Sequence, residues 1–150
     1  MFGQSDDLAI LKTLTSTLND SVNGYREAAK DVESDNFRQL FNEFADRRST
    51  ASADLQAEVR RLGGEPDQDG STMGGIHQAW LDMKAAVTGR DDKAVINEVE
   101  RGEDYLKEKF ETALASDKLS GESRAVVERT YQSVREGHDR VSSLKHGMEA

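Results

Sequence analysis

Residues 37–64 read FRQLFNEFADRRSTASADLQAEVRRLGG, and this stretch decides the fold class. Its apolar side chains recur every three or four residues, which is the spacing of one face of a bundle helix. These positions are Phe37, Phe41, Phe44, Ala51, Leu55, Val59 and Leu62. Arg48 lies on the same stripe, and Gly63 and Gly64 end it, because glycine readily adopts the left-handed conformation that terminates helices. The stretch therefore predicts one long amphipathic helix.

The same spacing predicts helices in the rest of the chain. We expect long helices over residues 5–34, 91–115 and 121–145, and a short helix over 71–88. Side chains that can cap the four long helices are Ser5, Asp35 or Asn36, Asp91 and Ser120. No sustained alternation of β-branched residues and no Asn-Gly hairpin turn is present in the sequence, so we predict no strands.

The lengths of the connections predict the topology. Tight turns join the first helix to the second and the third to the fourth, whereas residues 63–90 separate the second from the third. Two helix pairs with one long connection are typical of ferritin-like folds. We predict an all-α, ferritin-like up-down four-helix bundle whose crossover, residues 63–90, carries the short extra helix. At 150 residues, we expect a single domain over residues 1–150.

Composition excludes several classes of function. A net charge of -9 without a block of Lys or Arg disfavours binding to nucleic acids and to anionic membranes. The absence of cysteine excludes thiolate catalysis and Cys-ligated metals. No Gly-x-Ser-x-Gly elbow or phosphate loop is present, so we favour a protein that is not an enzyme. Because neither a secretory signal nor an apolar run of about 20 residues is present, we expect a cytoplasmic protein.

Polar residues on the helical stripes are the candidate site. The sequence predicts a buried or half-buried ion pair between Arg48 and Glu103. We expect Tyr25 and His138 to satisfy the remaining hydrogen-bonding capacity of this pair. The predicted site is therefore a core polar network of these four residues, with no catalytic residue assigned.

A metal centre is the alternative for the same region. Di-iron and di-manganese sites in such bundles require Glu-x-x-His on two helices. The residues three positions before the histidines at 77, 138 and 146 are Gly74, Arg135 and Ser143, so the motif is missing. We expect no cofactor. If iron or manganese binds, the ligands to test are Glu100, Glu103, His138 and Asp139.

The segment EVERGEDY, residues 98–105, contains several acids that the helical period separates. It predicts that Glu103 points into the bundle and that Glu100 lies on a flank. Glu98 and Asp104 are predicted to face solvent. Most of this acidity is therefore expected at the surface.

Glycines within helices mark a second feature of the candidate site. Gly24, Gly102 and Gly137 each directly precede one of the polar stripe residues. Mid-helix glycine is unfavourable by about 1 kcal/mol relative to alanine, so a local reason is expected. Close helix approach around large side chains is the interpretation that we favour, and a cavity for a small ligand is the alternative.

Several segments together resemble a bacterial family of ferritin-like four-helix bundles catalogued as a domain of unknown function. These segments are LNDSVNGYREAA (18–29), LQAEVRRLGG (55–64), GSTMGGIHQAW (70–80), GRDDKAVINEVERGEDY (89–105) and EGHDRVSSL (136–144). The resemblance implies the bundle fold and no established activity. Because the Glu-x-x-His pairs are missing, it does not extend to iron oxidation or storage.

These observations predict a non-catalytic protein that acts through protein contacts, and the resemblance implies a stress-associated role. The alternative is a degenerate di-metal protein or oxidoreductase that uses Glu100, Glu103 and His138. Ile10, Leu14 and Leu40 lie beside the helical stripes and broaden their apolar faces. A protein partner or a homodimer would explain this breadth, as would packing against the crossover.

Overall fold

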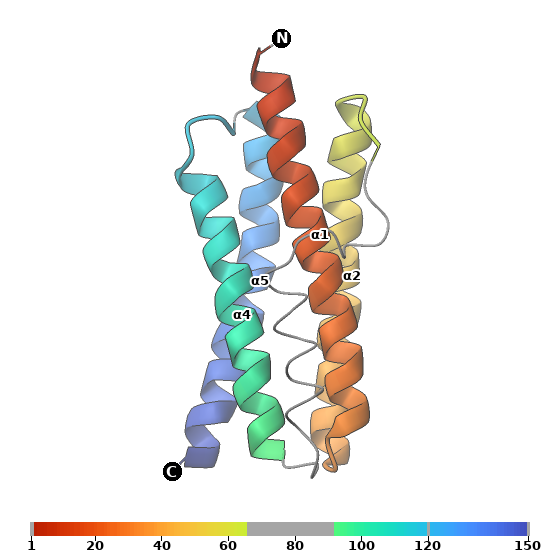
Figure 1. The fold of residues 1–150 in the computed structure, drawn as a ribbon, viewed down its shortest axis with the longest axis vertical. Helices are drawn as coiled ribbons and strands as arrows, with labels where there is room; N and C mark the ends of the chain where they lie inside the picture. Colours follow the sequence, from red (N-terminus) through yellow and green to blue (C-terminus); the bar gives the residue numbers. More distant parts are fainter. Residues whose placement is uncertain (1, 66–91, 120, 150) are drawn as a thin grey trace.

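The computed structural model describes residues 2–65, 92–119 and 121–149, with side chains between residues 6 and 147. Four long helices make up most of these residues (Figure 1). They are α1 (Phe2–Asp31), α2 (Asp35–Arg61), α4 (Asp92–Ala115) and α5 (Gly121–Glu149). The described ranges contain no strand, and the helices pack side by side. The prediction of an all-α four-helix bundle is confirmed.

The bundle consists of two antiparallel hairpins, α1–α2 and α4–α5, which pack through α1 on α4 and α2 on α5 (Figure 1). At one end, the carboxylate of Asp92 accepts hydrogen bonds from the backbone N–H groups of Glu33 (2.8 Å) and Ser34 (3.1 Å). At the other end, the Ser123 hydroxyl donates to Glu58 (2.7 Å). Helix α4 therefore begins beside the α1–α2 turn, at the end of the bundle opposite to the C-terminus of α2. This placement agrees with a single long crossover.

Two predicted helix starts differ from the structure. Helix α1 already includes residues 2–5, so Ser5 lies inside the helix and does not cap it. Once a helix has nucleated, an added residue is nearly neutral in free energy, and a helix can extend past a good capping residue. Helix α2 is capped by Ser34, not by Asp35 or Asn36, because the Ser34 hydroxyl accepts a hydrogen bond from the N–H of Phe37 (3.3 Å). The predicted caps Asp91 and Ser120 and the predicted helix 71–88 lie outside the described residues.

The glycine stop that the sequence predicts at the end of α2 is present in the structure. Gly63 has a φ of +87°, and its N–H and that of Gly64 donate to the carbonyls of Arg60 (2.9 Å) and Val59 (3.0 Å). This is the Schellman arrangement that the glycine pair predicts. Helix α5 continues to Glu149, a turn beyond the predicted end at Lys145.

The core lies along the predicted stripes. Its fully buried apolar side chains include Leu11, Leu18, Tyr25, Phe41, Leu55, Val59, Ile96, Val99, Leu106, Phe110, Val127, Val134 and Val141. Phe37 and Leu62, at the two ends of the α2 stripe, are only partly buried. Among the described helices, none is both long and apolar enough to cross a membrane.

Candidate functional site

An ion pair lies at the centre of the bundle, where the stripes of α2 and α4 face each other. The Arg48 guanidinium donates from Nη1 to Glu103 Oε2 and from Nη2 to Oε1, both at 2.6 Å. The side-chain exposure is 2% for Arg48 and 0% for Glu103. Two parallel charge-assisted hydrogen bonds fix both side chains, because the planar fork of arginine matches the two carboxylate oxygens.

The remaining donors of Arg48 reach the other two helices. Nη1 also donates to the hydroxyl of Ser21 on α1 (3.0 Å), and Nη2 lies 3.5 Å from the carbonyl oxygen of Val134 on α5. The guanidinium therefore contacts a group on every other helix of the bundle. Ser21 was not among the predicted residues, although its position four residues before Tyr25 places it on the same side of α1.

Gly137 provides the space for the guanidinium. A Cβ atom at this position would overlap Nη2 of Arg48 and would lie 3.2 Å from Oε1 of Glu103. A glycine therefore allows the α5 backbone to approach the ion pair closely. Of the two interpretations of Gly137, this geometry supports close helix approach and not a ligand cavity. The guanidinium occupies the space that a side chain at this position would need.

Tyr25 forms the apolar side of the site. Its ring is fully buried, and Cζ of Arg48 lies 5.6 Å from the ring centroid, within the range of a cation–π contact. The ring also packs edge-on against Phe44, with centroids 5.3 Å apart. Burial and, next, the negative charge of Glu103 raise the pKa of Tyr25 well above its ordinary value, so the phenol stays neutral at neutral pH.

The negative charge of Glu103 also keeps the Arg48 guanidinium protonated. Burial by itself lowers the pKa of Arg48, but the adjacent carboxylate of Glu103 more than offsets this effect, so the pKa of Arg48 is raised. The guanidinium thus remains a cation throughout the accessible pH range.

His138 does not join the network, which corrects the prediction for this residue. Its side chain is 17% exposed, and its Nε2 lies 2.6 Å from Asp104 Oδ1, while Nδ1 lies 3.4 Å from Asp139 Oδ1. Because each residue turns a helix by about 100°, the inward position on α5 belongs to its neighbour Gly137, and His138 points to the flank near α4. The predicted inward position on α5, residue 138, is therefore one residue beyond the observed one, residue 137.

The alternative metal ligands are separated in the same way. Glu100 binds Lys145 on α5 (2.7 Å), while both oxygens of Glu103 bind Arg48. Asp139 has 66% of its side chain exposed. In the described part of the chain, no three His, Asp or Glu side chains converge as a metal site would require. At the centre of the bundle, the Arg48 guanidinium binds both oxygens of Glu103, the most deeply buried carboxylate of the described residues.

Two residues of the acidic segment 98–105 were predicted to face solvent, and only one of them does. Asp104 is 62% exposed, as expected, but Glu98 is only 15% exposed and pairs with Arg101 at 3.0 Å. The predicted exposure of Glu98 is therefore wrong. Neighbouring helices in a bundle cover a wider arc than the central stripe, so residues flanking the stripe also become partly buried.

Sequence reasoning did not identify a second polar cluster at the end of α2. Glu58, which is 5% exposed, accepts two hydrogen bonds from Arg61 and one from Ser123, each at 2.7 Å. The hydrogen bonds from Arg61 are the main reason that the pKa of Glu58 is lowered. The spacing of Glu58 and Arg61 signals a helical pair, but the contact with Ser123 depends on how α5 packs on α2.

Residues 6–116, which are more than half of the chain, match the sequence profile of a domain of unknown function, DUF2383. The chain belongs to the DUF2383 family. This match confirms the resemblance to a family of unknown function. No curated protein matches the chain. The DUF2383 match covers the helices that supply Ser21, Tyr25, Arg48 and Glu103, and ends before α5.

Proposed function

We propose that this DUF2383 protein is a non-catalytic helical bundle that acts through protein contacts. In this proposal, the buried pair of Arg48 and Glu103 takes the place of a ferritin-like di-metal centre. The two antiparallel hairpins and the single long connection support a ferritin-like bundle. The resemblance to bacterial bundles of this kind motivates a stress-associated role in the cytoplasm as part of the same proposal.

One observation carries the proposal: both oxygens of the innermost carboxylate bind the guanidinium of Arg48 at 2.6 Å. A metal centre at this position would need Glu103 as an oxygen donor and would bring a second positive charge next to Arg48. Breaking a buried, doubly hydrogen-bonded pair is strongly unfavourable. The arrangement therefore favours a structural role for the polar centre.

Metal analysis of purified protein tests this proposal. Protein from cells supplied with iron and manganese is expected to retain less than about a tenth of an equivalent of either metal, because functional sites hold their metal tightly. Adding about 1 mM Mn²⁺ should leave the Tm unchanged, whereas a site with a Kd of about 10 µM would raise it by on the order of 5 °C or more.

The Glu103→Ala variant separates the two functions. Stoichiometric metal in the wild-type protein that is lost in this variant would contradict the proposal and support the degenerate di-metal protein. Glu108→Ala is a matched control, because Glu108 is an exposed carboxylate on the same helix and is not one of the alternative ligands. Metal content that is low in the wild-type protein and in both variants is the expected result.

A further inference from the structure

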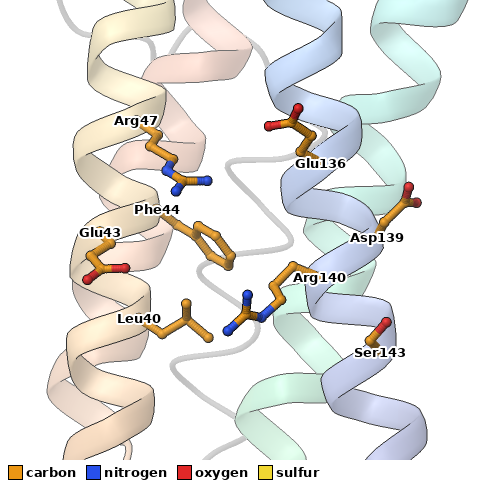
Figure 2. A pocket seen from close by; sticks show the side chains of 8 residues that line it. All are labelled: Leu40, Glu43, Phe44, Arg47, Glu136, Asp139, Arg140 and Ser143. Atoms are coloured by element: carbon orange, nitrogen blue, oxygen red, sulfur yellow. The ribbon is translucent and has the colours of Figure 1, made fainter.

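A groove of about 430 Å³ lies between α2 and α5 on the outside of the bundle (Figure 2). Its apolar floor comes from Leu40, which is half-buried, and Phe44, which is almost fully buried. Charged side chains from both helices form its rim. None of the residues that line the groove belongs to the central ion pair.

The charges on the rim form an alternating pattern. On α2, Glu43 precedes Arg47 by four residues, and on α5, Glu136 precedes Arg140 by four residues. Because the two helices are antiparallel, the acid of each helix lies level with the arginine of the other (Figure 2). Adjacent corners of the groove therefore carry opposite charges, and diagonal corners carry the same charge.

These four side chains form no ion pair within the described part of the chain, although the spacing of four residues on each helix would allow one. Figure 2 shows Arg47 and Arg140 extending over the groove, one at each end of it. Asp139 also lines the groove, but Figure 2 shows its carboxylate pointing away from α2, and its Oδ1 lies 3.4 Å from Nδ1 of His138. Apart from Asp139, the rim thus presents two acids and two arginines that have no ion-pair partner among the described residues.

The pattern is complementary to itself. A twofold axis parallel to the helices, in the plane of the groove, would place Arg47 opposite the Glu136 of a second copy and Glu43 opposite its Arg140. A twofold axis perpendicular to the helices in the same plane would pair Arg47 with Glu43 and Glu136 with Arg140. Every corner meets the opposite charge in both arrangements, as an isologous interface requires.

We propose that the α2–α5 groove is a self-association site whose occupant is a second copy of this chain. This inference rests on the proposed function and names its partner. The aliphatic stems of the arginines of one copy can cover Leu40 and Phe44 of the other, while their guanidinium groups bind the carboxylates of the rim. Eight residues line the groove, fewer than the roughly 20–30 per side of a standard interface, so the dimer is weak.

Sedimentation velocity over about 10 µM to 1 mM protein is the first measurement. We expect dimer formation in the upper part of this range, and the dissociation constant should rise with salt because rim charges are screened. Arg47→Glu should raise the dissociation constant at least about tenfold, since it places two acids opposite each other. Arg26→Glu is the matched control: Arg26 is exposed on α1, and reversing its charge should leave dimer formation unchanged.

Mixing two variants identifies the symmetry. Arg47→Glu and Glu136→Arg should each remain monomeric alone but form a heterodimer together if the axis is parallel to the helices. Arg47→Glu with Glu43→Arg should do so if the axis is perpendicular. Each variant should unfold at an unchanged temperature at low protein concentration, which would show that the fold is intact, because these exposed side chains make no ion pair with another described residue.

Three results would overturn the proposal: a wild-type protein that is monomeric at 1 mM, a dimer that Arg47→Glu does not weaken, or a lack of heterodimer in both mixtures. A monomer at all concentrations would leave the groove to a different partner. These outcomes are independent of the metal analysis, so the self-association site can fail while the non-catalytic role stands, and the reverse also holds.

Discussion

Replacement of Arg48 by methionine tests the central ion pair most directly. Methionine keeps much of the length of the side chain but removes the cation and both hydrogen bonds to Glu103. Glu103 is completely buried, so water cannot replace the lost partner. Removing one member of a buried pair is destabilising by about 3–5 kcal/mol, which is a large part of the roughly 5–15 kcal/mol by which a domain is stable.

Urea unfolding at pH 7 and 25 °C, followed by far-ultraviolet circular dichroism, measures this loss. The double variant Arg48→Met/Glu103→Leu should recover most of it, because two apolar side chains leave no charge without a partner. Arg26→Met is the control for removal of an exposed arginine, with an expected change within about 0.5 kcal/mol.

The free energies also define a double-mutant cycle. A coupling energy of at least about 2 kcal/mol between Arg48 and Glu103 is expected for a pair in direct contact within one buried network. A loss below about 0.5 kcal/mol for Arg48→Met, or a coupling energy near zero, would refute the reasoning. Either result would mean that the pair is solvated in solution and behaves as a surface salt bridge.

Two further predictions concern the surroundings of this pair and the end of α2. Gly137→Ala should destabilise the bundle by about 1–3 kcal/mol, because the new Cβ overlaps the Arg48 guanidinium. Gly147→Ala on the same helix is the control and should be neutral or slightly stabilising, because nothing lies within 4 Å of that position. Equal effects of the two variants in urea unfolding would argue against the close approach. Glu58→Gln should lower the free energy of unfolding at pH 7. Because the pKa of Glu58 is lowered in the folded state, its stabilising contribution is complete above the unfolded pKa of about 4.3 and is lost as the pH falls through the folded pKa. The free energies of unfolding of the wild-type protein and the variant should therefore converge in acid. A difference that persists at pH 2 would contradict this assignment.

The inward-facing residues could largely be predicted because helical spacing is a property of the sequence. Val99 and Glu103 face the core as the period of α4 requires, and Arg48 lies between Phe44 and Ala51 on the α2 stripe. Where a stripe was ambiguous by one residue, the prediction failed. On α5, both Gly137 and His138 fit the spacing between Val134 and Val141, and the larger polar residue was chosen over the glycine.

Contacts between helices could not be predicted to the same degree. The hydrogen bonds from Arg48 to Ser21 and from Ser123 to Glu58 join residues 27 and 65 positions apart in the chain. The cap of α2 at Ser34 also depends on a contact between distant residues. The carboxylate of Asp92 at the start of α4 accepts hydrogen bonds from two backbone N–H groups of the same turn. Local preference alone allowed Asp35 or Asn36 to cap α2, and the position of α4 favours the conformation in which Ser34 does so.

The sequence by itself determined four amphipathic helices, their turns, the connection that joins the two pairs, and the inward direction of Arg48 and Glu103. These features depend on the period of the helix and on the lengths of the connections. Only the tertiary structure decided that Gly137 lies against the guanidinium, that His138 turns outward to Asp104, and that four charges gather around the α2–α5 groove. The rotation and axial shift of each helix relative to its neighbours set these contacts, and both are determined by the packing of all four helices together.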